Sequence, residues 1–98
     1  MFGWFDAHNA KEFGQSIALL FMQRMPLQTN WTQKGFEIKS RSAMKELEKK
    51  VVDFQIANSM NTYKTAQMAN TFKWALLDAG YEAGYVDELT QWLVARMR

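Results

Sequence analysis

The sequence predicts an all-α fold, a compact bundle of about four helices with an aromatic-rich core. Apolar residues recur at helical spacing in four segments, and turn-forming residues separate these segments. No segment shows sustained alternation of apolar and polar residues, so no sheet is expected. Aromatic residues make up 14% of the 98 residues, and their large side chains suit the core of a domain this small.

The first helix is expected over about residues 6–25, with Asp6 as its N-cap. Pro26 should end it, because proline cannot continue a helix and pushes the preceding residue out of the helical region. Residues 27–35 then form a connector, and either Asn30 or Thr32 caps the next helix. One face of the first helix is apolar and should face the core: Ala10, Phe13, Ile17, Leu20 and Phe21.

The second helix is expected over about residues 36–56, before a group of turn formers at residues 58–62. Glu37 with Arg41, and Glu46 with Lys50, have the i,i+4 spacing at which opposite charges support a helix. The stripe predicted to face the core consists of Phe36, Ala43, Met44, Leu47, Val51 and Phe54.

The third helix is expected over about residues 62–79, with Gly80 and Tyr81 forming a Schellman-type end. Most of its surface is apolar, which predicts a central helix surrounded by the others. On this placement, Trp74→Ala should cost roughly 3–5 kcal/mol. The polar residues form one narrow strip: Lys64, Gln67, Thr71 and Asp78.

The fourth helix is expected over about residues 85–97. Asp87 and Glu88 would lie in its first turn, and Arg96 and Arg98 at its end, as the helix dipole favours. Its apolar face consists of Tyr85, Val86, Leu89, Trp92, Leu93 and Met97.

These elements predict a single helical domain over residues 1–98, of which residues 1–5 form an N-terminal arm. The chain has no Cys, which excludes a disulfide framework and thiol chemistry. The apolar start, residues 2–5, is too short for a signal peptide, and the longest apolar run, residues 17–22, is too short to span a membrane. A cytoplasmic protein is therefore expected.

Reactive side chains are too few to predict an enzyme. His8 is the single histidine, and Glu12 shares its helix face, but no second His or Cys completes a metal site. The segment Gly14–Ala18 departs from the nucleophile-elbow pattern at its last position and lies inside a helix. No catalytic residue, metal, cofactor or small-molecule substrate is predicted.

Four cations lie along one side of the second helix and could follow a phosphate backbone: Lys34, Arg41, Lys45 and Lys49. The net charge is only +2, and acidic residues lie beside the row, so a solvated surface is the favoured interpretation and nucleic-acid binding the alternative. The last two helices resemble a helix-turn-helix in length, but Asp87 and Glu88 would repel DNA from the second of them.

Ile38, Val52 and Ile56 lie among these lysines, opposite the core stripe. Other parts of the chain are expected to cover them, as is usual in a small helical domain; otherwise a partner protein or a second copy does so. The candidate protein-binding residues on this helix are Ile38, Lys45, Lys49, Val52 and Ile56.

Phe2, Trp4 and Phe5 make the N-terminal arm strongly aromatic. The arm could pack into a groove between helices, insert into a partner or a membrane interface, or move freely. Packing is favoured because exposed aromatic residues promote aggregation, and a membrane is disfavoured because no basic cluster lies nearby. These features together predict a small non-catalytic interaction or adaptor module that binds another protein or itself.

Overall fold

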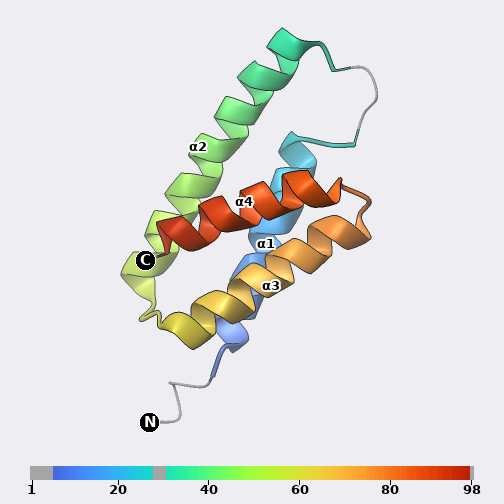
Figure 1. Ribbon diagram of the computed structural model, residues 1–98. Helices are drawn as coiled ribbons and strands as arrows, with labels where there is room; N and C mark the ends of the chain where they lie inside the picture. Colours follow the sequence, from blue (N-terminus) through green and yellow to red (C-terminus); the bar gives the residue numbers. More distant parts are fainter. Residues whose placement is uncertain (1–5, 28–30, 98) are drawn as a thin grey trace.

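The computed structural model describes residues 6–27 and 31–97, and four helices fill most of these ranges. They are α1 (His8–Arg24), α2 (Gln33–Ala57), α3 (Thr62–Asp78) and α4 (Ala83–Arg96). The helices run up, down, up and down in chain order (Figure 1), and the described part of the chain contains no strand. The predicted all-α bundle of four helices is therefore confirmed.

The core lies between α1 and α3, which run side by side in the same direction, with α2 against α1 and α4 against α3 (Figure 1). Each helix contributes large side chains that are almost fully buried. Burial of such apolar surface provides the main driving force for folding. The largest of these side chains are Phe21, Phe72, Ile17, Leu47, Met68, Leu76, Leu93, Val51 and Val86.

Gly14 sets the distance between α1 and α3. A Cβ atom at this position would lie 2.4 Å from the carbonyl oxygen of Met68, which is closer than any real Cβ contact. The glycine inside α1 therefore serves packing, because only a residue without a side chain lets the two backbones approach this closely.

The helix N-termini use different caps. Thr32 caps α2, since its hydroxyl oxygen accepts a hydrogen bond from the Gly35 amide at 2.9 Å. Asp6 is not the N-cap of α1 as predicted: Ala7 holds that position, and Asp6 accepts a hydrogen bond from the His8 amide at 3.1 Å. The predicted cap is thus displaced by one residue.

Helix α4 begins two residues before the expected start because Glu82 caps it. The Glu82 carboxylate accepts hydrogen bonds from the amides of Gly84 at 2.9 Å and Tyr85 at 2.8 Å. These bonds lower the pKa of Glu82. Asp87 and Glu88 consequently lie in the second turn of α4, which corrects the prediction that they occupy the first.

The predicted Schellman end of α3 is confirmed. Gly80 has a φ of 101°, its amide donates to the Leu77 carbonyl, and the Tyr81 amide donates to the Leu76 carbonyl. This turn directs the Tyr81 side chain back to α1, where its hydroxyl donates to the carbonyl of Met25 at 2.6 Å. The end of α1 is thereby tied to the α3–α4 turn.

Helix α3 is not surrounded on all sides, so the prediction of a buried Trp74 was wrong. Trp74 is 55% exposed, and Tyr63 is 38% exposed. Two neighbouring helices, α1 and α4, cover the face that carries Met68, Phe72 and Leu76. A four-helix domain leaves the opposite face open, even where that face carries large apolar side chains.

Candidate functional site

Helix α2 is the longest helix and has the least covered surface. Of its 25 residues only Ala43, Leu47 and Val51 are buried, while Phe36, Met44 and Phe54 are partly buried against the core. These six residues are the stripe that the sequence predicted. In Figure 1 α2 lies at one edge of the molecule, and its first turns project beyond the other helices.

The side of α2 opposite this stripe carries a continuous row of exposed residues, which we call the outer seam. Steps of four and three residues separate its members, the spacing of positions that face a partner helix in a coiled coil. Six residues form the outer seam, and all are exposed: Ile38, Ser42, Lys45, Lys49, Val52 and Ile56.

The apolar members of the outer seam remain open to solvent. Ile38 is 53% exposed, Val52 46% and Ile56 80%. The prediction that other parts of the chain cover them was therefore wrong. Since α2 packs on α1 through its opposite face, the described part of the chain has no element left to cover the seam.

Two carboxylates on the flanks of α2 form ion pairs with other helices. Glu46 accepts two hydrogen bonds from the guanidinium of Arg24 in α1, at 2.8 and 3.1 Å. Glu48 lies 3.2 Å from the guanidinium of Arg96 in α4. The hydrogen bond from Arg24 holds the pKa of Glu46 below its ordinary value. Glu46 therefore bonds to α1 rather than to Lys50, the partner predicted from spacing.

The cations of the predicted phosphate-binding row are exposed and available. They are Lys34, Arg41, Lys45 and Lys49. Among the described residues, no carboxylate lies within ion-pair distance of any of them, and Glu37 does not pair with Arg41. The row and the outer seam share Lys45 and Lys49, so positive charge and apolar surface occupy the same side of α2.

The remaining predicted interaction residues, Phe2, Trp4 and Phe5, lie outside the described residues. Packing, display and free movement of the arm stay predictions.

His8 and Glu12 come together as their spacing predicts. His8 Nε2 lies 3.4 Å from Glu12 Oε1, and both side chains are largely exposed. Within residues 6–27 and 31–97, no group of three or more His, Cys, Asp or Glu side chains converges on a point that could hold a metal ion. The pair has the geometry of an ordinary surface contact.

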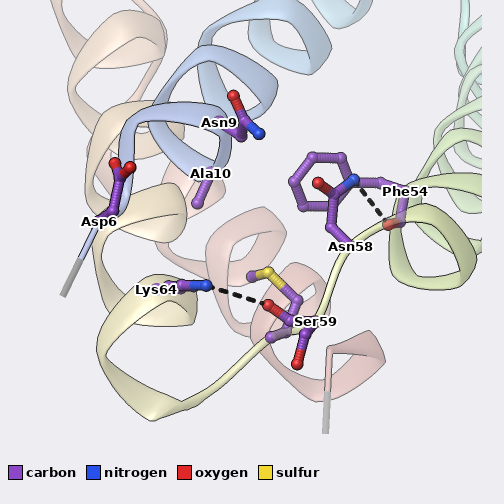
Figure 2. A pocket seen from close by; sticks show the side chains of 8 residues that line it. Asp6, Asn9, Ala10, Phe54, Asn58, Ser59 and Lys64 are labelled. Atoms are coloured by element: carbon purple, nitrogen blue, oxygen red, sulfur yellow. Dashed lines mark hydrogen bonds between the residues drawn. The ribbon is translucent and has the colours of Figure 1, made fainter. Parts of the chain in front are cut away.

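A polar cavity of about 220 Å³ lies where α1 begins, α2 ends and α3 begins. Figure 2 shows two of its polar side chains engaged by nearby backbone: Lys64 Nζ donates to the Ser59 carbonyl at 3.3 Å, and the Asn58 amide donates to the Phe54 carbonyl at 3.1 Å. These bonds close the α2–α3 connection. The complete lining is Asp6, Asn9, Ala10, Phe54, Asn58, Ser59, Met60 and Lys64.

A second cavity, of about 230 Å³, has a mostly apolar lining, half of it aromatic, and lies between the end of α1 and the starts of α2 and α4. Trp31 meets Phe36 edge-on at 6.3 Å, and Phe36 packs at 6.1 Å from Tyr85. The Tyr85 hydroxyl is buried, and its polar neighbour is the Ser40 side chain, with which it forms no hydrogen bond of ordinary length and angle. Burial raises the pKa of this hydroxyl.

No protein-family model, curated protein or solved structure matches the chain. In the part of the chain that the structure describes, no helix has both the length and the apolar character needed to cross a membrane.

Proposed function

We propose that this protein is a non-catalytic protein-interaction module whose binding surface is the outer seam of α2. One observation supports this most: Ile38, Val52 and Ile56 are aligned on one face and are 46–80% exposed. An aligned apolar row at helical spacing is typical of surfaces that bind another helix. The other large apolar residues exposed in the described structure are divided among α1, the α1–α2 connection and α3: Leu19, Leu27, Tyr63 and Trp74.

The proposal places the module in the cytoplasm, since a chain without Cys suits a reducing compartment. It assigns no catalytic role, because the imidazole of the single histidine forms an exposed surface pair with Glu12. Binding would occur through one long helix face, with the α1–α3 pair holding that helix in place.

Site-specific photo-crosslinking in the native cell tests this proposal. A photoreactive amino acid at position 52 should give a defined adduct, whereas the same group at position 39, on the side of α2, should not. Substituting Ile38 and Ile56 by Gln should abolish the adduct from position 52. An adduct of twice the 11.5 kDa mass would identify a second copy as the partner. Absence of any adduct specific to position 52 would contradict the proposal.

Nucleic-acid binding is the second candidate function, and the unpaired state of the basic row favours it. Lys34, Arg41, Lys45 and Lys49 contact no carboxylate of the described residues. If they bind phosphates, affinity for a labelled oligonucleotide should fall steeply with added salt, because counterions are released on binding. Fluorescence anisotropy measures this. The absence of binding at low salt would exclude the second candidate.

A further inference from the structure

We infer that the partner of the outer seam is an amphipathic helix with carboxylates at its centre and apolar residues at both ends. This inference rests on the proposed function and adds the chemistry of the partner. It follows from three features of α2: the symmetry of the seam, the uncompensated charge at its centre, and the poor fit of a second copy.

The seam is nearly symmetric about its midpoint. It runs from Ile38 to Ile56, about 27 Å along the helix axis at 1.5 Å per residue. Lys45 and Lys49 lie one on each side of the middle, while Ile38 and Ile56 lie at the ends. A partner helix therefore meets apolar, basic and apolar surface in that order, whichever direction it runs.

The positive charge at the centre is not neutralised within the described structure. The nearest carboxylates in sequence, Glu46 and Glu48, lie on the two flanks of α2 and form ion pairs with Arg24 of α1 and Arg96 of α4. A partner that buried the seam without supplying carboxylates would remove two ammonium groups from water and leave them unpaired, which is strongly unfavourable.

Asp53 lies one helical turn after Lys49, at the i,i+4 spacing of surface neighbours, but no described carboxylate lies within ion-pair distance of Lys45 or Lys49. Glu37 and Asp53 are neighbours of Ile38 and Val52 in the chain, toward the two ends of the seam. Among the charged side chains of this surface that form no ion pair, the positive ones, Lys45 and Lys49, therefore lie at the middle of the seam. This distribution matches a partner whose acidic residues are central.

A second copy of the chain matches poorly. Antiparallel pairing of two seams about their midpoints would place Lys45 opposite Lys49 of the other copy, and parallel pairing would place each lysine opposite itself. Four ammonium groups would gather at the centre of the interface in both cases, and like charges at such positions oppose pairing. The seam thus favours a different chain over self-association.

A phosphate backbone matches only the middle of the seam. Lys45 and Lys49 could contact phosphates, but Ile38, Val52 and Ile56 would lie against a charged polymer and bury no apolar surface there. An acidic amphipathic helix pairs with both kinds of side chain at once.

Three synthetic helical peptides test this inference. They share Leu at the positions facing Ile38, Val52 and Ile56, and carry Glu, Gln or Lys at the positions facing Lys45 and Lys49. Fluorescence anisotropy should show the Glu peptide binding about tenfold more tightly than the Gln peptide, with the Lys peptide weakest. The difference should shrink as salt is added.

Charge reversal provides the matched control. The variant K45E/K49E should invert the order, so that the Lys peptide binds best. The variant K39E/K50E makes the same change in net charge on the same helix but outside the seam, and should keep the original order. Circular dichroism and thermal melts establish that both variants are folded.

Several results would overturn the inference. In the peptide experiment these are equal binding of the three peptides, binding of none of them, or an equal response of both charge-reversed variants. A dimer seen by light scattering that K45E/K49E dissociates would identify a second copy as the partner. Tighter binding of an oligonucleotide than of the Glu peptide at the same seam would identify a nucleic acid. The proposed function is tested separately: if crosslinks from position 52 form while the peptides show no charge preference, only the inference about the partner fails.

Discussion

The α1–α3 pair and α2 differ in how they use their residues. Helices α1 and α3 have 17 residues each, and bury five and four of them, whereas α2 has 25 residues and buries three. Core packing explains the sequence of the short helices well. It explains only one face of the long helix, and the outer seam lies on the other.

Helix α2 is attached to the bundle along one side. Phe54 stacks on Phe13 of α1 with ring centroids 4.2 Å apart and planes 11° from parallel. The ion pairs of Glu46 and Glu48 join it to α1 and α4. No residue between 33 and 42 is fully buried, and Phe36 is the large apolar side chain in this stretch that packs against the core. Five predictions test this contrast, from the largest expected effect to the smallest.

Removal of a core ring from α3 should have the largest effect. Phe72 is 1% exposed, so Phe72→Ala should lower the free energy of unfolding by about 3–5 kcal/mol, enough to unfold a domain of this size. Trp74 is on the same helix but 55% exposed, and Trp74→Ala should cost about 1 kcal/mol or less. Urea titrations of both variants measure the difference. Equal losses would mean that α3 has no distinct inner face.

Gly14→Ala should separate the α1–α3 pair. The new Cβ would meet the Met68 carbonyl at 2.4 Å, and backbone cannot move aside as a side chain can. We expect a loss of about 1–3 kcal/mol. Gly84→Ala is the matched comparison and should cost less, because its Cβ would meet the capping carboxylate of Glu82 at 3.2 Å, which a small side-chain shift relieves, and alanine favours a helix. A stable Gly14→Ala variant would refute the close approach.

Tyr81→Phe should loosen the end of α1. The Tyr81 hydroxyl bonds to the Met25 carbonyl at 2.6 Å, and its loss leaves that buried acceptor unpaired at a cost of about 1 kcal/mol. Tyr85→Phe removes a buried hydroxyl whose polar neighbour is the Ser40 side chain, with which it forms no hydrogen bond of ordinary length and angle, so it should change the thermal midpoint less than Tyr81→Phe does. If both variants lose the same stability, burial of the rings alone accounts for the effect.

The Arg24–Glu46 bond should make the attachment of α2 sensitive to acid. Arg24 holds the pKa of Glu46 below its ordinary 4.5, so this bond stabilises the fold above about pH 4.5 and is lost as the pH falls further. The protection of α2 amides, measured as the observed exchange rate relative to the intrinsic rate at each pH, should therefore fall on acidification in the wild type and fall less in Glu46→Gln. An identical pH response in both proteins would show that the bond contributes nothing.

Substitutions on the outer seam should have the smallest effect on stability. Val52→Gln and Ile56→Gln replace side chains that are 46% and 80% exposed, so each should change the free energy of unfolding by about 0.5 kcal/mol or less. Chemical denaturation measures this. A large loss would mean that the seam is covered within the folded chain, which would remove the basis of the proposed function.

The helices and their ends follow largely from local sequence signals. Pro26, Thr32 and Gly80 mark boundaries through fixed φ, a side-chain cap and a left-handed turn. The predicted start of α4 was two residues too late because glutamate is not among the usual N-cap residues. In the structure the Glu82 carboxylate accepts hydrogen bonds from the first free amides of this helix. The acceptors of Arg24 and Arg96 could not be predicted, since Glu46 and Glu48 are far from them in the chain.

The amino-acid sequence by itself determined that this protein forms four amphipathic helices, because apolar periodicity and helix caps act over a few residues. It also placed Ile38, Val52 and Ile56 opposite the core stripe of α2. Only the tertiary structure decided which of two apolar faces is buried, leaving Trp74 and the outer seam exposed. Such choices depend on how many neighbours a helix has, and four helices provide too few to cover every apolar side chain.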